Sequence, residues 1–151
     1  MKELQQYLSK FGNIKIEHLH LEGKEIYCST ITEKTTKEKN KKMFEGIPIG
    51  NIKNNKFKPS LFLLEEISKQ SNKKIYINNK AEWLFLCKRD VFEESIIKIE
   101  DNDKLKTNEI YLIQNEHNEN LGIAQIKQDG KNKILKNLFD RGDFLRRERK
   151  R

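Results

Sequence analysis

The sequence predicts an α+β protein built from two small domains. The first half alternates helix-like and strand-like patterns, whereas the second half consists mainly of short apolar stretches separated by polar turns. Between the halves lies the polar stretch "SNKK" at residues 71–74. The chain has 151 residues, of which 35% are hydrophobic and 36% charged, so two domains with modest cores fit its length. We therefore expect domains at residues 1–72 and 73–151.

The first domain is predicted to contain two helices. Residues 2–11 place Leu4, Leu8 and Phe11 at helical spacing. A second helix is expected to open at Pro59-Ser60, where proline suits a first turn, and to run through residue 70.

Strand patterns lie between these two helices. Residues 13–23 alternate and are expected to pair with residues 24–30 in a hairpin whose turn is centred on Glu22-Gly23. Residues 44–60 are typical of a strand followed by a turn, because glycine and proline limit regular structure at Gly46, Pro48 and Gly50. The basic stretch 33–42 fits either a loop or an exposed helix, and the sequence does not decide between them.

The second domain is predicted to be a small, partly closed barrel. One helix, at about residues 79–88, interrupts a series of short strands, and a last helix is expected at 143–150 with Asp143 as its N-cap. Trp83 lies in the apolar stretch "WLFLC", which favours a place in the core over an exposed platform for a base. The expected strands are residues 74–78, 95–99, 109–115, 121–128 and 133–139.

Positive charge is concentrated in two segments. The net charge is +8, and residues 73–135 carry none of it, whereas residues 33–42 carry +3 and residues 136–151 carry +4. Arginine offers a planar fork for two phosphate oxygens and a face that stacks on bases, which lysine does not. The basic segment 136–151 is either a solvated tail or a docked nucleic-acid surface. The apolar pair Phe144-Leu145, just before Arg146, favours a docked surface. Five of the six arginines fall in this segment: Arg141, Arg146, Arg147, Arg149 and Arg151.

Catalytic and metal-binding patterns are missing from the sequence. It contains no phosphate-binding loop, no dinucleotide fingerprint and no nucleophile elbow. The pair His18-x-His20 has no third ligand of a suitable type nearby. Cys28 and Cys87 are far apart and predict two buried free thiols in a reducing compartment. The sequence shows no secretory signal and no membrane-length apolar run, so we expect a cytoplasmic protein. We also expect a monomer that is not an enzyme and holds no cofactor or metal.

Several stretches resemble one known family. "KKIYINNKAEWLFLCKRDVFEESIIKI" and "EIYLIQNEHNENLGIAQI" are similar to the opening and the central hairpin of a PUA domain. "KNLFDRGDFLRRE" resembles the closing segment of the archaeal Nip-seven ribosome-biogenesis factors, and "GIPIGNIKNNKFKPSLFLLEEIS" resembles their pre-PUA domain. The similarity covers residues 45–151 well and 1–44 loosely. Lys88 and Ser95 stand where, or close to where, the PUA pattern has glycine, so these turns must accept side chains.

This resemblance implies an N-terminal α/β pre-PUA domain, a C-terminal PUA pseudo-barrel and a non-catalytic function. The implied function is that of a large-subunit ribosome-biogenesis factor that binds single-stranded, U-rich pre-rRNA and meets other assembly proteins through its N-terminal domain. The alternatives are an accessory or subunit of an RNA-modification enzyme, and a protein-interaction adaptor in ribonucleoprotein assembly. The resemblance assigns the RNA contacts to Arg146, Arg147 and Lys150. Charge alone adds Arg141, Arg149 and Arg151. Lys88 and Arg89 add positive charge beside the helix at 79–88 and suit phosphate contacts.

Overall fold

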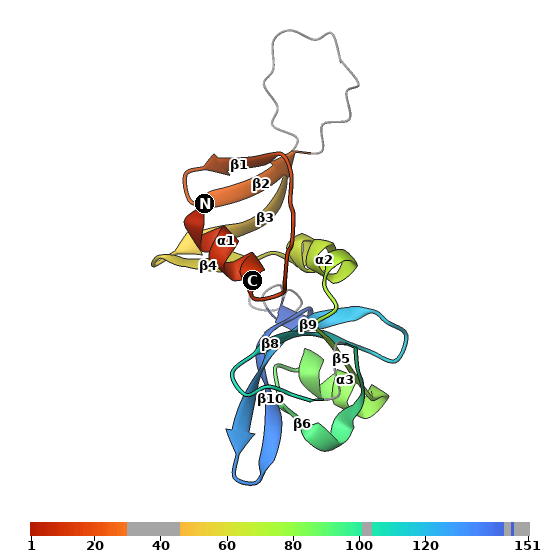
Figure 1. Cartoon of the computed structure of the whole chain (residues 1–151). Helices are drawn as coiled ribbons and strands as arrows, with labels where there is room; N and C mark the ends of the chain where they lie inside the picture. Colours follow the sequence, from red (N-terminus) through yellow and green to blue (C-terminus); the bar gives the residue numbers. More distant parts are fainter. Residues whose placement is uncertain (30–45, 101–103, 144–145, 147–151) are drawn as a thin grey trace, which may run out of the picture.

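The computed structural model of the chain describes residues 1–29, 46–100, 104–143 and 146, and it confirms the predicted α+β class. Within these residues the strands form two sheets (Figure 1). One sheet has four strands in the order β1-β2-β3-β4, and the other has six in the order β6-β10-β9-β8-β5-β7. The four-stranded sheet comes from the predicted first domain and the six-stranded sheet from the second. The division at residue 72 stays a prediction.

Two helices accompany the four-stranded sheet, as predicted. Helix α1 spans Lys2–Ser9 and buries Leu4 and Leu8, while α2 spans Leu61–Gln70. Ser60 is the N-cap of α2, and its hydroxyl accepts a hydrogen bond from the Leu63 amide at 3.3 Å. Pro59 ends a strand instead of occupying the first turn of the helix, so that detail of the prediction was wrong.

The four strands follow the predicted order with shifted boundaries. They are β1 (Leu19–Glu22), β2 (Glu25–Ser29), β3 (Gly46–Lys53) and β4 (Lys56–Pro59). The first strand begins at Leu19 and not at residue 13, because His18 has a φ of 56°, which interrupts extended backbone. The β1–β2 turn is centred on Gly23-Lys24, one residue later than predicted. Within the predicted stretch 44–60, residues 46–59 form a complete hairpin, since Asn54 and Asn55 both adopt the positive φ of a tight two-residue turn.

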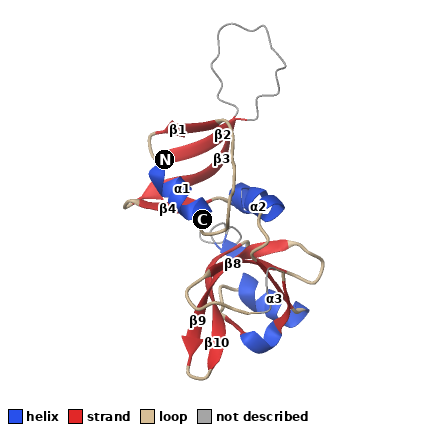
Figure 2. Ribbon diagram, viewed as in Figure 1, coloured by secondary structure: helices blue, strands red, loops and turns tan. Residues whose placement is uncertain are grey.

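The six-stranded sheet curls into a partly closed barrel, as predicted (Figure 2). Strands β5 and β8 pair in parallel and the other pairs are antiparallel. The two edge strands, β6 and β7, do not pair with each other, so the barrel stays open. Helix α3 (Asn79–Leu86) covers the inside of the curl, and the short β6 and the 3-10 turn Glu93–Ser95 were not predicted. The strands are β5 (Lys74–Ile77), β6 (Val91–Phe92), β7 (Ile96–Ile99), β8 (Ile110–Gln114), β9 (Asn120–Asp129) and β10 (Asn132–Asp140).

The hydrophobic core is not divided strictly between the two sheets. One cluster lies inside the curled sheet around Phe85. The other contains Leu4 and Leu64 from α1 and α2, yet it also includes Ile110 and Ile123 from β8 and β9. The outer face of the barrel therefore packs against the helices of the first half.

Polar contacts hold the junction between the halves in place. The Gln70 side chain bonds both the amide and the carbonyl of Lys15 at 2.8 Å, and the Ser71 hydroxyl donates to the Phe11 carbonyl at 2.7 Å. The Lys73 ammonium donates to the Lys10 carbonyl and pairs with Glu109. Lys73, in the stretch expected to be a linker, thus contacts both halves, and the shared hydrophobic cluster adds to this junction.

Some sequence-based expectations lie outside the described residues or were wrong. The basic stretch 33–42 is outside them, and so is most of the helix predicted at 143–150. The cysteines are free thiols, but Cys87 is exposed and Cys28 only partly buried, so the expectation of buried thiols was wrong. No helix among the described residues combines the length and the apolar character that crossing a bilayer requires.

Candidate nucleic-acid interface

Helix α3 presents an exposed tryptophan. The Asn78 side chain caps the helix by accepting from the Ala81 amide at 2.9 Å. Ala81 and Phe85, four residues apart, face the core, and Trp83 lies on the other side of the helix with 68% of its surface exposed. The predicted core position for Trp83 was therefore wrong. An exposed indole in this position is free to stack against a planar ligand.

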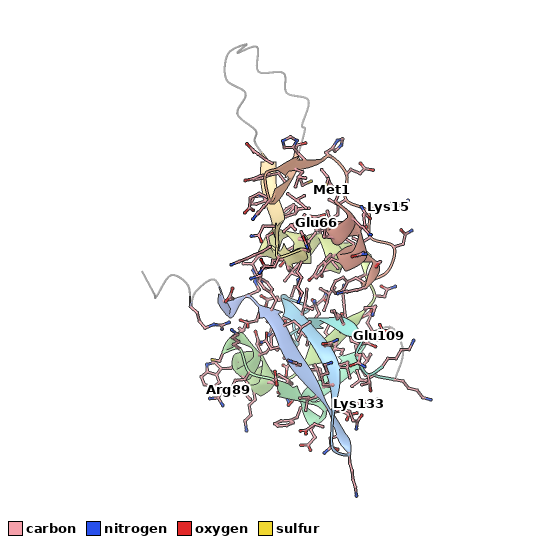
Figure 3. All side chains as sticks on the ribbon, turned by 90° about the vertical axis from the view of Figure 1, so that its left-hand side faces the viewer. Met1, Lys15, Glu66, Arg89, Glu109 and Lys133 are labelled. Atoms are coloured by element: carbon pink, nitrogen blue, oxygen red, sulfur yellow. The ribbon has the colours of Figure 1, made fainter. Side chains whose placement is uncertain are left out.

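The turn after α3 carries two exposed cations. Lys88 adopts the left-handed conformation, with φ 66°, at the position where the PUA pattern has glycine. A side chain is tolerated there at a cost of about 1–2 kcal/mol, and the turn keeps its hydrogen bond from the Arg89 amide to the Leu84 carbonyl at 3.1 Å. Lys88 and Arg89 are both exposed, and Figure 3 shows Arg89 beside α3 on the outside of the barrel.

Arg146 joins the end of α3 to the end of β10. One guanidinium nitrogen donates to the Leu86 carbonyl at 2.7 Å, and the other donates to the Asp140 carboxylate at 3.0 Å. The Asp140 side chain is only 1% exposed, so its charge needs this partner. Asp143 lies 3.8 Å from the same guanidinium. We call the contacts of Arg146 with Leu86 and Asp140 the arginine latch.

Two further residues, Asn137 and Gly142, support the arginine latch. The Asn137 amide donates to Asp140 at 3.1 Å and to the Phe85 carbonyl at 2.8 Å, so it binds the same two elements. Gly142 passes so close to α3 that a Cβ atom there would lie 2.0 Å from the Leu86 carbonyl oxygen and 2.8 Å from Asp140 Oδ1. Glycine is needed at this position for space rather than for backbone conformation.

The Gly142→Ala variant tests this close approach. The added methyl group must push residue 142 away from the Leu86 carbonyl, which is backbone and cannot move aside cheaply. We expect the free energy of unfolding to fall by about 1–3 kcal/mol, as for other overpacked sites. Urea unfolding followed by circular dichroism measures this change. Gly130→Ala is the control: nothing lies within 4 Å of its added Cβ, although its φ of +60° makes alanine mildly unfavourable.

A groove of about 600 Å³ lies beside α3, and Arg146 of the arginine latch is among its lining residues. Trp83 forms part of one wall, and Arg141 and Arg146 form part of another. Arg141 is about half exposed; its guanidinium donates to the Asn120 carbonyl at 3.3 Å and lies 3.9 Å from Glu65 on α2. Glu82 and Glu119 also line the groove, so its two acidic side chains balance the charge of the two arginines. An aromatic face and two guanidinium groups suit a nucleotide, whose base can stack and whose phosphate can accept hydrogen bonds.

The structure brings together only part of the predicted set. Arg141 and Arg146 line the same groove, and Lys88 and Arg89 lie at the adjoining end of α3. Arg146 already uses its guanidinium within the protein, which the sequence alone did not indicate. Sequence reasoning also missed Asp140 and Gly142, although both belong to the "DRGDF" stretch that carries the resemblance. The remaining predicted residues, Arg147, Arg149, Lys150 and Arg151, lie outside the described part of the chain.

Metal-ligating side chains do not gather elsewhere in the described residues. No group of three or more histidine, cysteine or acidic side chains in that part of the chain could hold a metal ion. His18 lies on the surface of the first half, near Glu17 and far in sequence from the groove residues.

Comparison with known proteins points to one family and one fold. A family model described as the UPF0113 PUA domain matches residues 73–149. A UPF0113 protein from the archaeon Archaeoglobus fulgidus is 27% identical to this chain over 114 residues. The match covers 70% of this chain and 63% of that relative, so the chain spans less than two thirds of the relative's length. A solved structure of a conserved PUA domain protein from Thermoplasma acidophilum aligns over 97% of this chain and 92% of its own, with 14% identity and a TM-score of 0.57. Neither the family nor the relative is named as an enzyme.

Proposed function

We propose that this chain, which belongs to the UPF0113 PUA-domain family, binds single-stranded RNA through the groove beside α3 and the basic segment that follows β10. PUA domains generally bind RNA. The observation that carries the proposal is the exposed Trp83 in one groove with Arg141 and Arg146. The indole of Trp83, 68% exposed, offers a face on which an unpaired base can stack beside the two guanidinium groups.

The chemistry of the groove favours single strands over duplexes. Bases in a duplex are stacked on one another, so an indole cannot reach their faces, whereas unpaired bases can stack on tryptophan and on guanidinium planes. The groove contains few base-edge partners in fixed positions, so sequence preference is expected to be weak and biased toward easily unstacked pyrimidines such as uridine. Phosphate contacts by arginine and lysine supply most of the affinity and make it depend on salt.

The proposed biological role is that of a large-subunit ribosome-biogenesis factor. The support is the resemblance of "KNLFDRGDFLRRE" and of the pre-PUA stretch to the Nip-seven family. In this role the chain binds a single-stranded, U-rich region of pre-rRNA and meets other assembly proteins through its first half. Cross-linking in cells followed by sequencing tests it: enrichment of large-subunit rRNA precursors is expected, and enrichment of tRNA or mRNA alone would contradict it.

Two other functions stay as alternatives. An accessory subunit of an RNA-modification enzyme would use the same RNA groove, and co-purification with a catalytic partner would favour it. A protein-interaction adaptor would use the basic segment to bind acidic proteins, and competition between RNA and an acidic peptide would favour it. The exposed tryptophan favours RNA, because electrostatic binding to an acidic protein needs no stacking surface.

Neutralising the outer basic residues tests the role of the segment after β10. Changing Arg147, Arg149, Lys150 and Arg151 to glutamine leaves Arg146 and the arginine latch intact. Each lost phosphate contact lowers the slope of log K against log salt by about 0.7 for a single strand, so the slope should fall by up to about 3. Fluorescence anisotropy of a labelled oligouridine at several salt concentrations measures it.

The matched control removes four charges from the other basic stretch. Changing Lys34, Lys37, Lys39 and Lys41 to glutamine lowers the net charge by the same amount. The proposal expects a smaller change of slope for this control. Equal slopes for the two variants would show that only net charge matters and would overturn the assignment of the arginines as specific contacts.

A further inference from the structure

We propose that a second groove, between the two sheets, binds the continuation of the same RNA strand, so that the first half of the chain contributes directly to RNA binding through Lys58. This inference rests on the proposed function of the groove beside α3. It extends the binding surface from the PUA domain onto β4 of the four-stranded sheet.

The second groove has a volume of about 370 Å³ and lies where β4 faces β10. Its walls come from both halves of the chain: Phe57, Lys58 and Pro59 from β4, and Asn137 to Asp140 from the end of β10. Lys88, from the turn after α3, also lines it. The volume lies in the range of about 300–1,000 Å³ that is typical of pockets for small ligands, so it has room for about one nucleotide.

The floor of the second groove is apolar. Tyr7 and Phe57 pack with their ring centroids 5.1 Å apart, and Ile110 and Ile123 lie beside them. Burial raises the pKa of the Tyr7 phenol well above its ordinary value, so this ring stays neutral at any physiological pH. Leu138, which is 46% exposed, adds apolar surface to the lining of the groove. Such a floor suits the face of a base or the apolar side of a ribose.

The rim of the second groove is positive. Lys58 and Lys88 stand on opposite elements, both are exposed, and neither pairs with an acidic side chain among the described residues. The acidic residues that line the groove, Asp140 and Asp143, are both close to Arg146, whose single positive charge offsets one of their two negative charges. The lining thus has three cationic and two acidic side chains, a net charge of +1 whose sign fits a polyanion.

The two grooves meet at Arg146. This residue lines the groove beside α3 as well as the groove between the sheets. A strand whose base stacks on Trp83 can therefore pass over Arg146 and place its next phosphates between Lys88 and Lys58. The contacts of Lys73 with both halves and the packing of Ile110 and Ile123 against the helices of the first half support this path, because they join the two sheets.

Variants of Lys58 and RNAs of two lengths test the inference. The variants Lys58→Gln and Lys58→Glu are compared with Lys131→Gln and Lys131→Glu, which change the same charges at the exposed tip of the β9–β10 hairpin. Anisotropy titrations use oligouridines of about five and about twelve nucleotides, lengths within the range that single-strand-binding surfaces cover. All variants keep the full chain.

We expect Lys58→Gln to weaken binding of the longer RNA about fourfold at 0.15 M salt and to lower its salt slope by about 0.7, which is the contribution of one phosphate contact. Lys58→Glu should weaken it further. The short RNA, which the groove beside α3 holds alone, should bind equally well to all variants. The Lys131 variants should match the unmodified chain with either RNA.

Three results would contradict the inference, and they differ from failure of the proposed function. If the longer RNA binds Lys58→Glu as tightly as the Lys131 variants, the second groove does not hold RNA, while the groove beside α3 keeps its role. If both RNA lengths lose affinity equally in Lys58→Glu, Lys58 acts by long-range electrostatic attraction and does not contact the RNA that extends beyond the groove beside α3. If the unmodified chain binds neither RNA, the proposed function fails and the inference fails with it.

Discussion

Trp83→Ala should weaken binding of single-stranded RNA about 5- to 150-fold, because stacking of one base on an aromatic ring contributes about 1–3 kcal/mol. The fold should survive, since 68% of the Trp83 surface is exposed and its removal leaves no cavity in the core. Anisotropy titrations with oligouridine give the affinity, and circular dichroism confirms the fold. The salt slope should not change, because the variant removes no phosphate contact.

Phe92→Ala is the matched control for this variant. Phe92 is also a large exposed aromatic residue, at 63%, but it lies on β6 next to Glu93 and Glu94 and lines neither groove beside Arg146. It should bind RNA as the unmodified chain does. Equal losses in the two variants would show that exposed aromatic residues in general stick to RNA, and no loss in Trp83→Ala would remove the stacking role from the account.

Arg146→Ala should lower the free energy of unfolding by about 2–4 kcal/mol, because it leaves the buried Asp140 carboxylate without its guanidinium partner. Asp140 is 1% exposed and would keep only the Asn137 amide. The same variant removes the bond to the Leu86 carbonyl, so the chain after β10 should lose its attachment to α3. Urea unfolding measures the stability, and anisotropy measures the loss of RNA binding that follows.

The double variant Asp140→Asn with Arg146→Gln separates charge burial from attachment. Removing both charges avoids an unpaired carboxylate, so the double variant should be more stable than Arg146→Ala alone. Arg141→Ala serves as a further control, since its guanidinium is about half exposed and its ion pair with Glu65 is long at 3.9 Å. A stability of Arg146→Ala equal to that of Arg141→Ala would contradict a structural role for the arginine latch.

Local patterns in the sequence were sufficient to predict most of the secondary structure. The spacing of Leu4 and Leu8, the cap at Ser60 and the short apolar stretches of β8 to β10 are all local signals. The helices, most strands and the partly closed barrel were therefore predicted close to their places. The shifted start of β1 had no such signal. It depends on the positive φ of His18, which nothing in the residue type requires.

The candidate site was harder to predict because it depends on contacts between distant segments. Trp83 lies among apolar residues in the sequence, and only the orientation of α3, with Ala81 and Phe85 facing the core, leaves it exposed. Arginine clustering singled out Arg146 as an RNA contact, which stays a prediction, and it gave no sign of the buried Asp140 that binds it from a different element six residues away. The groove around Lys58 has no sequence signal, since it forms only where the two sheets meet.

The intrinsic fluorescence of Trp83 gives the most direct test of RNA binding beside α3. Trp83 is the single tryptophan of the chain, so any change in indole emission reports on this one position. Titration with oligouridine should quench the emission with the same midpoint as the anisotropy of the labelled RNA, and high salt should reverse both signals together. Anisotropy that reports binding while the tryptophan emission stays unchanged would place the RNA elsewhere on the molecule and contradict the proposed interface.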